Sequence, residues 1–111
     1  MIGHTGNLEA AIETVTSVDK LVAKIAKAVL KKKGTLIITA DHGNIEEMIN
    51  TETGEVITEH STNPVPFIVM NHFKYKLKKT GKLANIAPTI LDILGIDKPK
   101  LMTSKSLIEK K

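Results

Sequence analysis

Three of the four histidines in this chain lie in polar segments that glycine or proline marks as loops. His4 stands in the segment GHTG, His42 in ADHGN and His60 in EHSTNP, whereas His72 is interpreted as an ordinary loop histidine. Cysteine is absent, which excludes disulfides, thiolate nucleophiles and thiolate metal ligands. The side chains that could do chemistry are therefore imidazoles and carboxylates, which together suit divalent cations.

The pair Asp41 and His42 stands out because of its position. It directly follows residues 35–40 (TLIITA), an apolar run expected to be a buried strand. Open α/β sheets place ligands at the carboxyl ends of their strands, and Gly43 permits a turn that lets both side chains reach one ion. The pair suits Mn²⁺, Mg²⁺ or Zn²⁺. The structural alternative, which is compatible with metal binding, is that Asp41 caps a short helix beginning at Ile45.

The segment from residue 7 to residue 33 is predicted to form a helix ahead of that strand. Asn7 is a suitable N-cap, and the three lysines 31–33 would meet the negative end of the helix dipole before Gly34 ends it. Two helices with a break near residues 16–19 are the alternative. The apolar residues that recur at steps of three and four are Leu8, Ile12, Val15, Val18, Val22, Ile25 and Val29.

Shorter elements are predicted after the first strand. A short helix is expected over residues 45–50, a hairpin over residues 51–58 that turns at Thr53 and Gly54, and a second buried strand over residues 67–70. Helix, glycine and buried strand in this order are typical of an α/β fold.

The last third of the chain begins with a basic connection over residues 74–82. A helix is predicted over residues 85–94, with Pro88 in its first turn and Gly95 closing it. The tail is expected to be irregular, with an apolar anchor at residues 107–108.

Length and charge exclude several classes of function. A chain of 111 residues, 41% hydrophobic and 25% charged, is at most one small domain with a modest core. Its net charge of +4 comes entirely from lysine, and without arginine or tryptophan no nucleic-acid partner is expected. No apolar run suits a membrane span or a secretory signal, so no membrane partner is expected either. A cytoplasmic location fits these features.

Several motifs in one order resemble a known family. The segments GHTGN, ITADHGNIEEM, HSTNPVPFI, LANIAPTILDILG and MTSKSLI closely resemble the C-terminal part of cofactor-independent phosphoglycerate mutase, a member of the alkaline phosphatase superfamily. The resemblance runs across nearly the whole chain, and ADHGN together with HSTNPVP is specific. Ser104 departs from the family, which usually has glycine there, and no mechanistic weight is attached to it.

The resemblance implies a set of metal ligands. His4 and His60 would bind one ion, and Asp41 and His42 would bind the other. A complete site would hold two Mn²⁺ ions, with Mg²⁺, Co²⁺ or Zn²⁺ as alternatives. The family's remaining ligands and its nucleophilic serine come from earlier parts of its chain, so no catalytic nucleophile is expected here. All four side chains must then gather at one rim of a sheet.

The resemblance also implies a fold and an activity. Residues 1–111 would be the C-terminal portion of the metal-binding phosphatase domain, a fragment of a three-layer α/β/α domain with a mostly parallel sheet, and the phosphotransferase domain would be absent. The complete enzyme interconverts 3-phosphoglycerate and 2-phosphoglycerate in glycolysis through a phosphoserine. This chain is expected to be inactive without the remainder of the mutase chain. The alternative is a non-catalytic module of the same family that binds metal or a partner.

Overall fold

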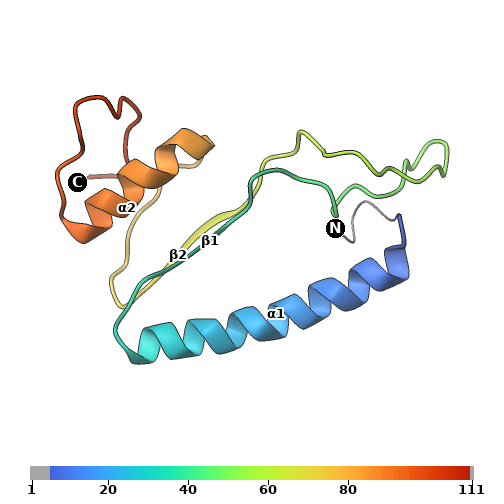
Figure 1. Cartoon of the computed structure of the whole chain (residues 1–111), viewed down its shortest axis with the longest axis horizontal. Helices are drawn as coiled ribbons and strands as arrows, with labels where there is room; N and C mark the ends of the chain where they lie inside the picture. Colours follow the sequence, from blue (N-terminus) through green and yellow to red (C-terminus); the bar gives the residue numbers. More distant parts are fainter. Residues whose placement is uncertain (1–5, 111) are drawn as a thin grey trace. The chain divides into compact units, whose positions relative to one another are not determined.

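The computed structural model describes residues 6–110, and the chain divides into two compact units, Met1–His72 and Phe73–Lys111. The first contains helix α1 (Leu8–Lys31) and strands β1 (Leu36–Thr39) and β2 (Phe67–Met70). The second contains the 3₁₀ helix η2 (Leu83–Asn85) and helix α2 (Ile86–Leu94) (Figure 1).

Helix α1 is one continuous helix, so the alternative of two helices is wrong. The side chain of Asn7 accepts a hydrogen bond from the Ala10 N–H at 3.0 Å, which confirms the predicted N-cap. Thr16 begins no second helix, because its hydroxyl donates to the Ile12 carbonyl at 2.8 Å within α1. Beyond the C-terminal end of α1, Lys33 and not Gly34 has the left-handed backbone conformation, with φ of 57°. The Gly34 N–H donates to the Val29 carbonyl at 2.9 Å.

The apolar face of α1 is largely uncovered in this unit. Only Ala11 and Ala26 are buried, and every residue from 12 to 20 is exposed. Ile12 keeps 60% of its surface exposed and Leu21 keeps 55%. Among the described residues, no helix combines the length and the apolar character needed to cross a bilayer.

Strands β1 and β2 form a two-stranded antiparallel sheet, in which Leu36 pairs with Met70 and Thr39 with Phe67. The parallel pairing expected from the sequence is therefore wrong for these two strands. A parallel pair needs a crossover, usually helical, whereas residues 40–66 contain no helix and return to the same end of the sheet. The existence of both strands is confirmed. Their predicted burial on both faces is not, because the residues of β1 and β2 are half-buried or exposed.

The connection between the strands differs from the prediction at residues 45–50. No short helix forms there; a turn at Ile45 and Glu46 is followed by an extended arm. A hairpin does form, because Ile49 forms an antiparallel bridge with Val56 and the Ile57 N–H donates to the Met48 carbonyl at 2.6 Å. Its first arm lies at residues 48–50, before the predicted range of 51–58, and the chain turns over residues 51–54. Met48 is 3% exposed, so it anchors the hairpin by apolar burial.

The second unit is organised around α2 and confirms the predictions for the end of the chain. Pro88 is buried in the first turn, and Gly95, with φ of 69°, ends the helix. The predicted apolar anchor is present, because Leu107 is 7% exposed and Ile108 forms an antiparallel bridge with Leu77.

Thr89 is the most deeply buried side chain of the second unit, at 0% exposure. Its hydroxyl donates to the Asn85 carbonyl at 2.7 Å and accepts the Leu107 N–H at 2.8 Å. The Thr89 hydroxyl therefore joins α2 to the C-terminal tail, and it both donates and accepts a hydrogen bond.

Candidate metal centre

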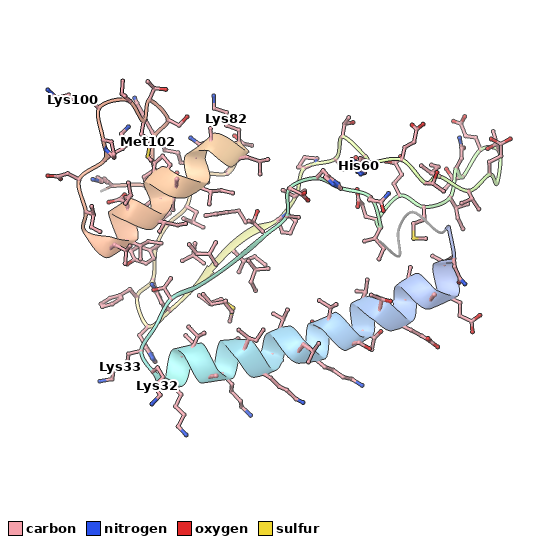
Figure 2. All side chains as sticks on the ribbon, viewed as in Figure 1. Lys32, Lys33, His60, Lys82, Lys100 and Met102 are labelled. Atoms are coloured by element: carbon pink, nitrogen blue, oxygen red, sulfur yellow. The ribbon has the colours of Figure 1, made fainter. Side chains whose placement is uncertain are left out.

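Two loops that are far apart in the sequence run beside each other where β1 ends and β2 approaches. Gly43 and Ser61 form an antiparallel bridge, and the Ser61 N–H donates to the Gly43 carbonyl at 2.9 Å. Figure 2 shows His60 on the segment that leads into β2, next to the segment that leaves β1. Because His42 and His60 are diagonal neighbours across this bridge, their rings can meet. They stack with centroids 3.6 Å apart and 15° between the planes.

Asp41 lies against the same ring of His42. Its Oδ2 is 3.6 Å from His42 Nε2, and its Oδ1 accepts the backbone N–H of His42 at 3.0 Å. The Asp41 carboxylate is 83% exposed and caps no helix, because none follows; the capping alternative is wrong. The carboxylate therefore remains available to an ion beside the imidazole.

The orientation of His42 suits a metal ligand. Its Nδ1 lies 3.1 Å from the Gly43 carbonyl, which can only accept a hydrogen bond. In the tautomer that donates from Nδ1 to this carbonyl, Nε2 keeps its lone pair on the side of Asp41. Metal-binding histidines usually have their second nitrogen fixed by such a carbonyl or carboxylate.

The candidate ligands do not form a complete metal site within the described residues. The structure brings together Asp41, His42 and His60, whereas His4 lies outside the described residues. Within residues 6–110, no group of three histidines or acids is placed to hold a single ion. Carboxylate and imidazole donors fit a divalent cation. Because an ion there would need further ligands, the assignment of these residues as metal ligands stays a prediction.

Glu46 joins the two loops and was not anticipated from the sequence. Its Oε2 accepts the Asn44 N–H at 2.8 Å, and its Oε1 accepts the Ser61 hydroxyl and, at 3.3 Å, the Asn63 amide. The Ser61 hydrogen bond above all, followed by backbone N–H groups, lowers the pKa of Glu46 from an ordinary 4.5 to about 2. The sequence shows an acid two residues after Asn44, but its contacts with the residues that follow His60 are visible only in the structure.

Gly43 lies at the close approach of these loops, where a side chain would displace the ends of the Ser61 and Glu46 side chains. It is buried, and a Cβ atom there would collide with the Ser61 hydroxyl and the Glu46 carboxylate. Asn44 adds a second connection, since its side-chain amide donates to the Glu59 carbonyl at 2.7 Å. The site is thus held by loop-to-loop hydrogen bonds rather than by a regular sheet.

Comparison with known proteins connects this arrangement to a family. The model of the metalloenzyme superfamily matches residues 1–98. The chain is 53% identical over 110 residues to the 2,3-bisphosphoglycerate-independent phosphoglycerate mutase of Acetivibrio thermocellus, covering 99% of this chain and 21% of the relative. It is 51% identical over 109 residues to the mutase of Clostridium botulinum, covering 98% of this chain and 21% of that one.

An archaeal relative gives the same result. The chain is 50% identical over 110 residues to phosphoglycerate mutase 2 of Methanosarcina barkeri, covering 99% of this chain and 21% of the relative. The chain therefore spans about a fifth of the length of these curated relatives. The resemblance drawn from the sequence motifs is confirmed: this chain belongs to the metalloenzyme superfamily and corresponds to a segment of 2,3-bisphosphoglycerate-independent phosphoglycerate mutase.

Proposed function

We propose that this chain supplies part of the di-metal site of a phosphoglycerate mutase that interconverts 3-phosphoglycerate and 2-phosphoglycerate in the cytoplasm. The observation that carries the proposal is the meeting of Asp41, His42 and His60 at the two neighbouring loops. The printed names of the relatives supply the reaction class.

The ligands divide between two ions. His60, together with His4, would hold one ion, and Asp41 with His42 would hold the other; Mn²⁺ is the first candidate and Mg²⁺, Co²⁺ or Zn²⁺ are alternatives. Bound cations neutralise charge on a phosphoryl group during transfer. The contribution of His42 is an unprotonated Nε2, oriented by the Gly43 carbonyl.

The remaining parts of the reaction are assigned to other segments of the mutase. The serine that would carry the phosphoryl group and the side chains that would bind phosphoglycerate belong to the remainder of the mutase chain. Residues 1–111 would complete a three-layer α/β/α phosphatase domain whose larger sheet is mostly parallel. By itself the chain would bind metal weakly and have no mutase turnover.

The uncovered surfaces of the first unit support such a partner. A helix is stabilised in water mainly by packing of its apolar face, yet five apolar side chains of α1 are about half exposed: Ile12, Val15, Val18, Leu21 and Ile25. Within residues 6–110 the β1–β2 sheet consists of two strands, and an isolated pair is marginal in water. Both features fit a segment that packs against further helices and strands.

The test uses the whole chain mixed with the Acetivibrio thermocellus mutase polypeptide from which the matching segment has been removed. We expect the mixture, and neither part alone, to bind Mn²⁺ tightly by electron paramagnetic resonance and to turn over 3-phosphoglycerate. His42→Ala should abolish both properties. His72→Ala is the matched control, because His72 Nε2 contacts the Leu30 carbonyl at 2.8 Å, away from the site.

The same experiment separates the alternative function. A non-catalytic partner-binding module is favoured by the exposed face of α1 and would form the complex without turnover. Mn²⁺ binding that is unchanged by His42→Ala would contradict the ligand assignment. Turnover by the isolated chain would contradict its dependence on the partner.

A further inference from the structure

We propose that Glu46 is a positioning residue that holds His42 and His60, the candidate ligands, at their mutual placement by joining the loop of His42 to the loop of His60. The proposal rests on the proposed function for the metal ions, and on the structure for the connection between the loops. No sequence motif identified Glu46 as part of the site.

The two oxygens of the carboxylate are divided between the two loops. Oε2 accepts the Asn44 N–H, two residues after His42, whereas Oε1 accepts the Ser61 hydroxyl, one residue after His60. Hydrogen bonds to an ionised acceptor are roughly twice as strong as neutral ones. One side chain therefore holds both loops at a fixed separation.

The Glu46 carboxylate lies next to the Gly43–Ser61 bridge, which makes this connection specific. Gly43, opposite Ser61, has no side chain, and the Glu46 carboxylate lies in the space that a Cβ atom would fill. The carboxylate thus lies beside the one backbone pairing that brings His42 and His60 into contact. Loss of Glu46 leaves three described bonds between the loops: the Ser61 N–H to the Gly43 carbonyl, the Asn44 amide to the Glu59 carbonyl, and the Asn63 amide to Glu47 at 3.3 Å.

The neighbouring acid provides a matched comparison. Glu47 has the same charge and also reaches the loop of His60, through the Asn63 amide at 3.3 Å, whereas the Asn44 N–H and the Ser61 hydroxyl bond to Glu46. If charge near the site were sufficient, the two acids would be equivalent. If the division of oxygens between the loops matters, only Glu46 positions the histidines.

The first measurement is the nuclear Overhauser effect between the His42 and His60 rings in the metal-free chain. Ring centroids 3.6 Å apart should give strong cross-peaks in the wild type and in Glu47→Ala. We expect Glu46→Ala to lose them, and Glu46→Gln to restore them in part, because the amide can still accept from one loop and donate to the Ser61 hydroxyl. The helix content of the chain, most of which comes from α1, is measured by circular dichroism and verifies that each variant remains folded.

The second measurement is Mn²⁺ affinity in the mixture with the truncated mutase polypeptide. Residues that orient metal ligands typically change affinity by about 10–100-fold, so we expect Glu46→Ala to weaken binding at least tenfold and Glu47→Ala to leave it unchanged. The proposal would be overturned if Glu46→Ala kept the cross-peaks between the two rings and an unchanged Mn²⁺ affinity. It would also be overturned if Glu46→Ala and Glu47→Ala lost cross-peaks and affinity equally.

The two measurements separate failure of this inference from failure of the proposed function. Absence of Mn²⁺ binding by the wild type would refute the metal site, while the ring contact would still decide whether Glu46 positions the histidines. If Glu46→Ala does not fold, Ser61→Ala removes only the Oε1 hydroxyl contact and should weaken the cross-peaks. Unchanged cross-peaks in Ser61→Ala would then contradict the proposal.

Discussion

Replacement of Thr89 by valine should weaken the attachment of the C-terminal tail to α2. Valine has nearly the same shape, but it removes the hydroxyl that accepts the Leu107 N–H at 2.8 Å and donates to the Asn85 carbonyl at 2.7 Å. Because Leu107 is 7% exposed, its N–H would be left without a partner and largely out of water. An unsatisfied buried donor costs about 1–3 kcal/mol. A value of about 2 kcal/mol corresponds to a roughly 30-fold more frequent opening of the tail.

The assay is amide hydrogen exchange at Lys78, whose N–H donates to the Leu107 carbonyl at 2.8 Å and is not itself altered by the substitution. We expect its protection to fall about 30-fold in Thr89→Val. Thr89→Ser is the control, because it keeps the hydroxyl and loses one methyl group, worth about 1 kcal/mol. If Thr89→Val protects Lys78 as well as the wild type does, the hydroxyl does not hold the tail and the reasoning fails.

Two further outcomes are expected in the first unit. The folded-state pKa of Glu46, about 2, is below its ordinary value of 4.5. The contribution of Glu46 to loop pairing is therefore complete above pH 4.5 and is lost as the pH falls through about 2. A midpoint near 4.5 in an NMR titration of the Glu46 carboxyl carbon would contradict this. Lys33→Gly should stabilise the end of α1 by about 1 kcal/mol, because φ of 57° is strained for a residue with a side chain. Lys32→Gly, at φ of −87°, should give no gain, and exchange of the Gly34 amide measures both.

Helices α1 and α2 were predictable because their signals are local. Asn7 and the apolar period specify α1, and Pro88 with Gly95 specifies α2, since caps and periodicity act within a few residues. The predicted helix at residues 45–50 was wrong for the opposite reason. Met48 is buried in the hairpin, so contacts beyond the segment overrode its weak local preference.

The candidate site was predictable in its residue types and not in its connections. The acid and imidazole at the end of β1 could be recognised from the order of a strand, a carboxylate and a glycine. Glu46 could not, because its partners Asn44 and Ser61 are identified only once the two loops are paired. His4 remains a prediction.

The sequence by itself determined the helices, the existence of β1 and β2 and the chemical nature of the candidate ligands, because each of these depends on neighbouring residues along the chain. The tertiary structure alone decided the antiparallel pairing, the stacking of His42 on His60 and the role of Glu46. These features depend on hydrogen bonds between segments about 15–35 residues apart, whose formation is governed by chain return and loop closure rather than by local preference.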